Sequence, residues 1–333
     1  MARETTVDVD RGPGAVAATR IDLVPHVAAR RGSQAWRQIK QGWQLYVMLF
    51  LPLLWLVIFA YVPMYGAQIA FRNYSPAFGI TGSEWVGWEN FQRFYDSFNF
   101  WPVLRQTLLL SGYTLAVMTP LPIIFALALN YALRSGFRRT VQMVAYAPHF
   151  ISTVVMVGII LQMLSTMGLV NQYLGKFGVD PINFMGEPSY FNSIFVWSEV
   201  WQHLGFASII YLAALTAIDP TLHEAAVIDG ANKLQRIRDI DLPGIMPVAV
   251  ILLILQLGFL LSTAFEKVYL MQNPLNQRSS EVIDTYVLRV SIFSQMPQWS
   301  YAAAIGLFKA VIGLVLILAA NQIARRLKAA SLW

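Results

Sequence analysis

Two pairs of side chains that could do chemistry share one apolar run, residues 194–218. Trp197 and Trp201 are four residues apart, and so are Glu199 and His203, so each pair would share one face of a helix. Ionisable groups inside a long apolar helix are costly, and they usually face the interior of a helix bundle or a water-filled path. The two pairs therefore indicate either a lined path or polar contacts between packed helices.

Lys309 lies in a later apolar run, and the sequence allows two roles for it. It could pair with a carboxylate such as Glu199 or Glu266, or it could complete a proton relay with Glu199 and His203. A second candidate set for a path, with the same alternative of helix contacts, comprises Gln256, Phe265 and Tyr269.

Other chemistries have little support in the sequence. The four histidines are scattered singly, so we expect no metal site, and the absence of cysteine excludes disulfides and thiolate chemistry. The phosphate-binding pattern G-x-x-x-x-G-K-[ST] does not occur. Glu281 and Asp284 could be the paired carboxylates of an enzyme that acts on glycans, but no other residue frames them as a site.

The candidate residues require helices that can cross a membrane. The 333-residue chain is 56% hydrophobic and only 13% charged, which fits a membrane protein better than a soluble domain. A bilayer core takes about 20 helical residues. Apolar runs of that length recur six times and predict an all-α fold with six transmembrane helices, at residues 46–71, 107–133, 140–164, 194–218, 245–270 and 301–323.

Lysine and arginine predict the orientation, because short basic loops tend to stay in the cytoplasm. Most of the 24 basic residues fall within residues 1–44, 134–139, 219–244 and the segment after 323. Both termini are therefore expected in the cytoplasm. The net charge of +6 follows from this topology and gives no reason to expect a nucleic-acid partner.

Composition divides the chain into a tail and a membrane domain. Residues 1–44 are predicted to be a partly disordered cytoplasmic tail that ends in an interfacial helix, and residues 45–333 to form the membrane domain. The first apolar run is a full span without a cleavage site, so we expect it to be retained. The outside segment 72–105 is dense in aromatic residues, which indicates either an aromatic belt on the outer leaflet or a docking surface for an external partner.

The segment 219–244 is far too polar to cross the bilayer, yet it is predicted to be helical. Asp219 is a candidate N-cap before Pro220, and Gly230 can end this first helix in a left-handed conformation. A second helix is expected from Asn232 until Pro243 stops it. Such short helices need a partner to pack on. That partner could be the inner leaflet or another protein.

The spacing in "EAAVIDGANKLQRIRDIDLP", residues 224–243, resembles the EAA motif of ATP-binding-cassette (ABC) importer permeases. All seven fixed positions of that motif match, namely Glu224, Ala225, Ala226, Gly230, Ile240, Leu242 and Pro243. The segments "WVGWENFQRF", "STAFEKVYLMQNP" and the terminal "SLW" are similar to the maltose-permease type of carbohydrate importer, in its oligosaccharide and polysaccharide branch, alginate importers included.

The resemblance implies a type I ABC importer permease fold with a cytoplasmic coupling helix between the fourth and fifth spans. It implies a non-catalytic subunit of the bacterial inner membrane that imports oligosaccharides or polysaccharide fragments. Its partners would be membrane lipid, a second homologous permease, an extracytoplasmic sugar-binding protein and two ABC ATPase subunits, which would bind ATP and Mg while this chain holds no cofactor. The sugar path would then be lined by the candidate residues of both sets, namely Trp197, Glu199, Trp201, His203, Gln256, Phe265 and Tyr269. An ion-coupled secondary sugar transporter is the alternative.

Overall fold

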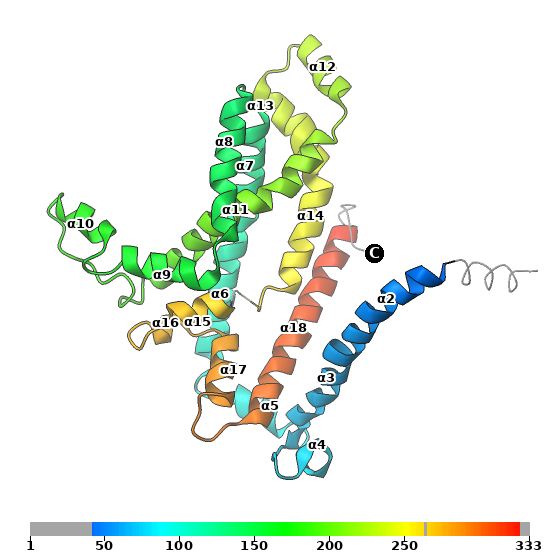
Figure 1. The fold of residues 1–333 in the computed structure, drawn as a ribbon, viewed down its shortest axis with the longest axis vertical. Coiled ribbons are helices and arrows are strands. Elements are labelled where there is room, and N and C mark those ends of the chain that lie inside the picture. Colours follow the sequence, from blue (N-terminus) through cyan, green and yellow to red (C-terminus); the bar gives the residue numbers. More distant parts are fainter. Residues whose placement is uncertain (1–41, 263–264, 327–333) are drawn as a thin grey trace, which may run out of the picture. The chain divides into compact units, whose positions relative to one another are not determined.

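The computed structural model describes residues 42–262 and 265–326, which are helical apart from one short hairpin and connecting turns (Figure 1). The all-α prediction is confirmed. The chain divides into two compact units, Met1–Pro63 and Met64–Trp333, and each is considered by itself. The tail through residue 41, with most of the expected interfacial helix, and the terminal "SLW" lie outside the described residues.

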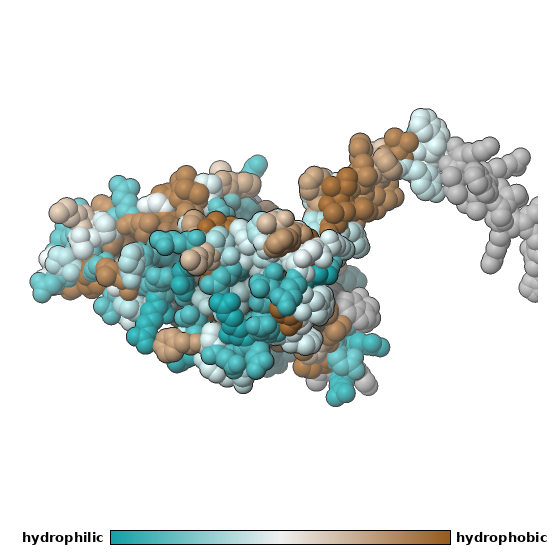
Figure 2. Space-filling view, turned by 90° about the horizontal axis from the view of Figure 1, so that it is seen from below, coloured by the Kyte–Doolittle hydropathy of each residue, from teal (hydrophilic) through white to brown (hydrophobic). Residues whose placement is uncertain are grey.

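The smaller unit contains α2 (Trp43–Leu56) and η1, a π-helical turn (Val57–Tyr61). Both are composed almost entirely of apolar residues, and the atoms of this segment are mostly coloured as hydrophobic in Figure 2. They continue into α3 (Val62–Met64) and the 3-10 helix η2 (Tyr65–Phe71). Trp43–Phe71 as a whole is long and apolar enough to cross a membrane, as predicted for the first span.

The larger unit begins at Met64, and the aromatic segment follows η2. Strands β1 (Arg72–Asn73) and β2 (Glu84–Trp85) pair antiparallel, α4 (Gly79–Gly82) lies between them, and α5 (Glu89–Tyr95) follows. Phe94 is buried in a core, whereas Trp88 remains exposed. The aromatic residues of this segment thus serve partly as core.

Among the described residues, four helical segments satisfy the length and hydropathy expected of a span. The second of them comprises α6 (Phe100–Met118) and α7 (Pro120–Asn130). The third comprises α13 (Lys233–Arg236), the π-helical turn η4 (Ile237–Asp241) and α14 (Leu242–Gly258). The fourth is α18 (Trp299–Arg326), which packs along α14 (Figure 1).

Two bent helix pairs raise the number of spans to six if each pair counts as one. Helix α11 (Phe191–Thr216) meets α12 (Pro220–Ile228) at 70°. The other pair departs from the uniform helix predicted over 140–164, because α8 (Ser135–Tyr146), η3 (Ala147–Phe150) and α9 (Thr153–Met163) include a bend of 102°. Pro148 interrupts the helix, and Ser152 starts a new one by accepting a hydrogen bond from Val155 N–H at 3.3 Å.

The predicted fifth span, 245–270, is also interrupted. Helix α14 ends at Gly258, and the short helix α15 (Phe265–Met271) begins after a break. The remaining elements are short helices, namely α10 (Leu169–Gly175), α16 (Gln277–Ser280) and α17 (Ile283–Ser291).

Helix α11 positions the candidate residues, because it packs against α6, α7, α8 and α14. One core cluster joins it to α7 and α14 through Ala126, Tyr211 and Ile245. Helix α11 also packs closely on α8 at Gly205, where an added Cβ atom would lie 2.2 Å from the carbonyl oxygen of Ala145. Only glycine fits this contact between two helix backbones.

Candidate functional site

Helix α12 begins and ends with the capping interactions expected of a stable short helix. Asp219 accepts a hydrogen bond from the backbone N–H of Thr221 at 2.9 Å, and this bond lowers the pKa of Asp219. At the other end Gly230 has φ +81°, Gly230 N–H donates to Val227 O, and Ala231 N–H donates to Ala226 O. This pair of bonds is a Schellman motif, so Gly230 ends the helix as predicted.

The second helix of the loop starts at Asn232, as predicted. Asn232 Oδ1 accepts from Gln235 N–H at 2.9 Å, and Gln235 Oε1 accepts from Asn232 N–H at 2.7 Å, which completes a capping box. The prediction that Pro243 stops this helix is wrong, because the helix continues through η4 into α14. In a regular α-helix the ring of Pro243 would clash with a backbone carbonyl group of the preceding turn. The π-helical turn immediately before the proline shifts these carbonyl groups.

The loop leaves its apolar side chains uncovered. The exposed fraction is 85% for Ile228 and 77% for Leu234, and no residue of α12 is buried. Glu224 and Ala225 are exposed beside them, while Ile240 in η4 and Leu242 at the start of α14 are half-buried. In Figure 1, α12 lies at one extremity of the larger unit, beyond the ends of α7 and α8. An exposed apolar surface of this kind suits a protein contact.

A second candidate feature is a cavity between α6, α11 and α14, with a volume of about 410 Å³. It brings together three residues that the sequence nominated for a path, Glu199, His203 and Gln256. Thr114 and Phe259 also line it. Mostly apolar walls with a few convergent polar groups are typical of small-molecule sites.

Glu199 is paired with a residue that sequence reasoning missed. Lys267 Nζ lies 2.7 Å from Glu199 Oε1, and the Lys267 residue is only 1% exposed. Gln202 Oε1 accepts a further hydrogen bond from Lys267 at 3.3 Å. The available signal was the presence of Lys267 within the predicted span 245–270, because a buried cation needs a carboxylate partner.

His203 connects this ion pair to the bend between α8 and α9. Its Nε2 lies 3.6 Å from Glu199 Oε2, and its Nδ1 lies 3.1 Å from Nδ1 of His149. The His149 ring in turn stacks on Phe206, with ring centroids 3.9 Å apart. The expectation of singly scattered histidines is thus wrong for this pair, although no group of three or more potential metal ligands occurs within residues 42–262 and 265–326.

The other nominated path residues lie elsewhere. Trp197 and Trp201 are about half exposed and do not line the cavity. Phe265 stacks on Tyr269, and Tyr269 stacks on Phe293 at 5.9 Å, so these aromatic rings form a separate group. The structure therefore unites the polar candidates and leaves the aromatic ones outside the cavity.

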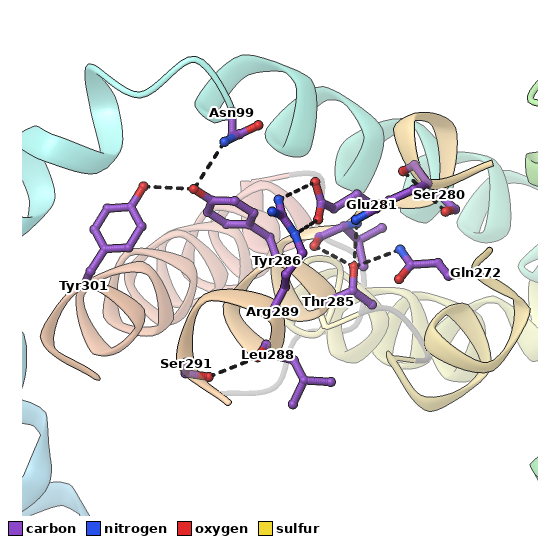
Figure 3. Close-up of polar contacts among 12 residues, drawn as sticks. Asn99, Gln272, Ser280, Glu281, Thr285, Tyr286, Leu288, Arg289, Ser291 and Tyr301 are labelled. Atoms are coloured by element: carbon purple, nitrogen blue, oxygen red, sulfur yellow. Dashed lines mark hydrogen bonds and ion pairs between the residues drawn. The ribbon is translucent and has the colours of Figure 1, made fainter. Parts of the chain in front are cut away.

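Lys309 pairs with neither Glu199 nor Glu266, contrary to one sequence expectation. It donates to Asp284. Figure 3 shows that Glu281 accepts two hydrogen bonds from Arg289, at 2.7 and 3.1 Å. Both carboxylates considered for an enzyme thus have a cation as partner. Nearby, the hydroxyl groups of Tyr286 and Tyr301 lie 3.1 Å apart and tie α17 to α18.

Comparison with known proteins defines the class of protein. The sequence model of the family "Binding-protein-dependent transport system inner membrane component" matches residues 118–329. The chain therefore belongs to this family of ABC transport permeases, and it is a multi-pass protein of the inner membrane.

Individual relatives cover almost the whole chain. A polygalacturonan/rhamnogalacturonan transport system permease protein, YteP of Bacillus subtilis, is 39% identical over 93% of this chain and 96% of its own. The protein LplB of the same organism is 37% identical over 91% of this chain and 95% of its own. A crystal structure of a bacterial ABC transporter that imports the acidic polysaccharide alginate contains a chain that is 38% identical, with a TM-score of 0.81 over 88% of this chain and 99% of that one.

Proposed function

We propose that this chain is the permease subunit of an ATP-driven, binding-protein-dependent importer of oligosaccharides or polysaccharide fragments. The observation that carries the proposal is α12, a capped helix that leaves Glu224, Ala225 and apolar side chains exposed beside a glycine turn. The printed names of the relatives support a polysaccharide-derived substrate, since they include a polygalacturonan/rhamnogalacturonan permease and an alginate importer.

In this proposal α12 docks on a separate ATPase subunit. Glu224 is the polar anchor, and Ala225 and Ala226 allow close approach because their side chains are small. Gly230 gives the turn that fixes the helix. Ile240, Leu242 and Pro243 join the loop to α14, and the two half-buried side chains at 240 and 242 support this role. Closure of the ATPases then moves a stiff helix instead of a flexible tether, as rigid-body gating requires.

The chain itself is non-catalytic in this proposal. ATP and Mg bind to the ATPase subunits, in keeping with a sequence that lacks the phosphate-binding pattern. The complete importer contains a second homologous permease, two ATPases and an extracytoplasmic binding protein, and both termini of this chain face the cytoplasm. One solved relative was crystallised as the alginate ABC transporter with an alginate pentasaccharide-bound periplasmic protein, which supports the last partner.

The cavity lined by Glu199, His203 and Gln256 is this chain's contribution to the sugar path. Sugar hydroxyl groups need hydrogen-bond partners, and these three side chains supply them from two helices. The Glu199 carboxylate is balanced by Lys267, so it contributes a polar contact without an unpaired negative charge. The second permease would complete the path.

Purification of the chain with its partners tests the proposal. The expected result is co-purification with an ABC ATPase whose hydrolysis rises when a sugar-loaded binding protein is added to proteoliposomes. A panel of galacturonan, alginate and neutral glucan oligosaccharides would identify the substrate. Proton-driven uptake by the chain alone would instead support a secondary transporter, although the Lys309–Asp284 pair gives no support to a relay through Glu199, His203 and Lys309.

A further inference from the structure

Asp241 is a fully buried carboxylate at the junction between the loop and α14. It occupies the variable position between Ile240 and Leu242 of the motif, so the motif itself assigns it no role. Its side chain is 0% exposed, and it ends the π-helical turn η4. A buried carboxylate is costly unless its oxygen atoms have partners. The residues around Asp241 therefore indicate which helices it connects.

Two residues from different helices contact this carboxylate. Tyr131, which follows the last residue of α7, donates its hydroxyl hydrogen to Asp241 Oδ2 at 2.7 Å. His223 on α12, the residue before Glu224, places its Nε2 3.3 Å from Oδ1. The direction of approach does not make this second contact a hydrogen bond, so the strong bond joins α14 to α7 and the weaker contact joins α14 to α12.

Other contacts support this connection. The guanidinium of Arg236 lies over the Tyr131 ring, 5.7 Å from its centroid, and so joins the second loop helix to the end of α7. At Gly244 an added Cβ atom would lie 2.6 Å from the Ile218 side chain, which shows how closely α14 approaches the end of α11. The end of α11, after which α12 begins, is thus in contact with the start of α14, where the loop ends.

We propose that Asp241 is a positioning residue that fastens the coupling helix α12 to α7 and α14, so that the three move together when an ATPase moves α12. This inference rests on the proposed function. Without the Tyr131–Asp241 bond, α12 would still bind the ATPase through its exposed residues and would keep its weak contact with Asp241, but a displacement that reaches α14 through the loop would reach α7 less completely. Coupling would then fall while assembly persists.

The test uses the complete complex in proteoliposomes with the Tyr131→Phe, Asp241→Leu and double variants. Tyr131→Phe is expected to reduce sugar transported per ATP hydrolysed by about tenfold, the factor that one hydrogen bond to a charged group can supply. Tyr211→Phe is the matched control, because Tyr211 lies in the core cluster between α7, α11 and α14 but is not among the residues that contact Asp241. The double variant should be no worse than Asp241→Leu alone, because Asp241→Leu already removes the acceptor of the Tyr131 bond.

His223→Gln provides a second test from the α12 side, with a smaller expected reduction because its contact with Asp241 is weaker. Normal transport per ATP in Tyr131→Phe and His223→Gln, equal to that of Tyr211→Phe, would overturn the proposal while leaving the importer function intact. A wild-type complex that assembles without sugar-stimulated hydrolysis would overturn the importer function and the role of Asp241 with it. A purely structural role for Asp241 would lower complex yield without changing transport per ATP, which would also overturn the proposal.

Discussion

Gly230 lies at the turn of the loop 219–244, and the backbone conformation there favours glycine over other residues. Its φ of +81° is unfavourable for any residue with a Cβ atom, by about 1–2 kcal/mol. The space around it is open, since no atom lies within 4 Å of an added Cβ. Gly230→Ala is therefore expected to act through backbone strain alone and to reduce sugar-stimulated ATP hydrolysis.

The matched control for this change is Gly136→Ala. Gly136 also has open space around its Cβ position, but it lies in α8 with ordinary helical geometry. Alanine there should be neutral or slightly stabilising, because it favours helix more than glycine does. Equal stimulation of hydrolysis in both variants would refute the importance of the left-handed turn.

Variants of the Glu199–Lys267 pair can distinguish a structural role of Glu199 from a role in sugar transport. Glu199→Gln leaves the buried Lys267 ammonium without its counter-charge, so the free energy of unfolding should fall by about 3–5 kcal/mol. Replacing both charges, as in Glu199→Gln with Lys267→Met, should restore most of that stability. Thermal unfolding of the purified complex in detergent measures both effects.

Sugar uptake by the same double variant then tests the path. If the Glu199 carboxylate contacts the sugar, uptake should remain impaired after stability has recovered. Uptake at the wild-type rate would show that Glu199 serves only to neutralise Lys267, and Glu199 would be removed from the proposed path.

At the scale of helices, the contact between α8 and α11 depends on Gly205. Gly205→Ala would drive a methyl group to within 2.2 Å of the Ala145 carbonyl oxygen, so the helices must separate at a cost of about 1–3 kcal/mol. The expected result is a lower unfolding temperature of the complex. Gly158→Ala in α9 is the control, since its Cβ position is open, and an equal effect of the two changes would contradict the close packing.

The N-cap of α12 can be tested in the same way. Asp219→Ala removes the acceptor for Thr221 N–H and should weaken α12 and the coupling that depends on it. Asp219→Ser keeps a capping oxygen and should preserve both. ATPase stimulation by the sugar-loaded binding protein measures the difference, and identical loss in the two variants would show that the cap is not what matters.

The helices of the loop could be predicted because each signal acts over a few residues. Asp219, Gly230 and Asn232 cap helix ends through bonds to neighbours in sequence, and the structure has all three where they were expected. The bend at Pro148 was missed because the apolar run 140–164 continues through it, and hydropathy does not record a change of direction. Pro243 was misjudged because a π-helical turn accommodates it.

Contacts between distant residues could not be predicted in the same way. Glu199 and Lys267 are 68 positions apart, and their pairing depends on the break after Gly258, which places Lys267 on a separate short helix. The contact of Tyr131 with Asp241 spans 110 positions and depends on how α7 and α14 pack. The sequence identified polar residues that needed partners, and the packing of helices decided which partners they have.

At the scale of the whole molecule, residues 42–262 and 265–326 include four to six candidate spans. Within the larger unit, α12 lies at one extremity and has no buried residue (Figure 1). In the proposed function the cavity and α12 have separate roles, one toward the sugar and the other toward an ATPase. Both proposed roles involve further subunits, which suits a family of transport components.

The most direct test of this account is ATP hydrolysis by the assembled importer with Glu224→Lys in α12. The account predicts that the permease still inserts into the membrane, that the ATPase no longer co-purifies or no longer responds to the sugar-loaded binding protein, and that the milder Glu224→Gln retains part of the response. A Glu224→Lys complex that co-purifies with its ATPase and is stimulated as strongly as wild type would contradict the central claim that α12 is the coupling helix.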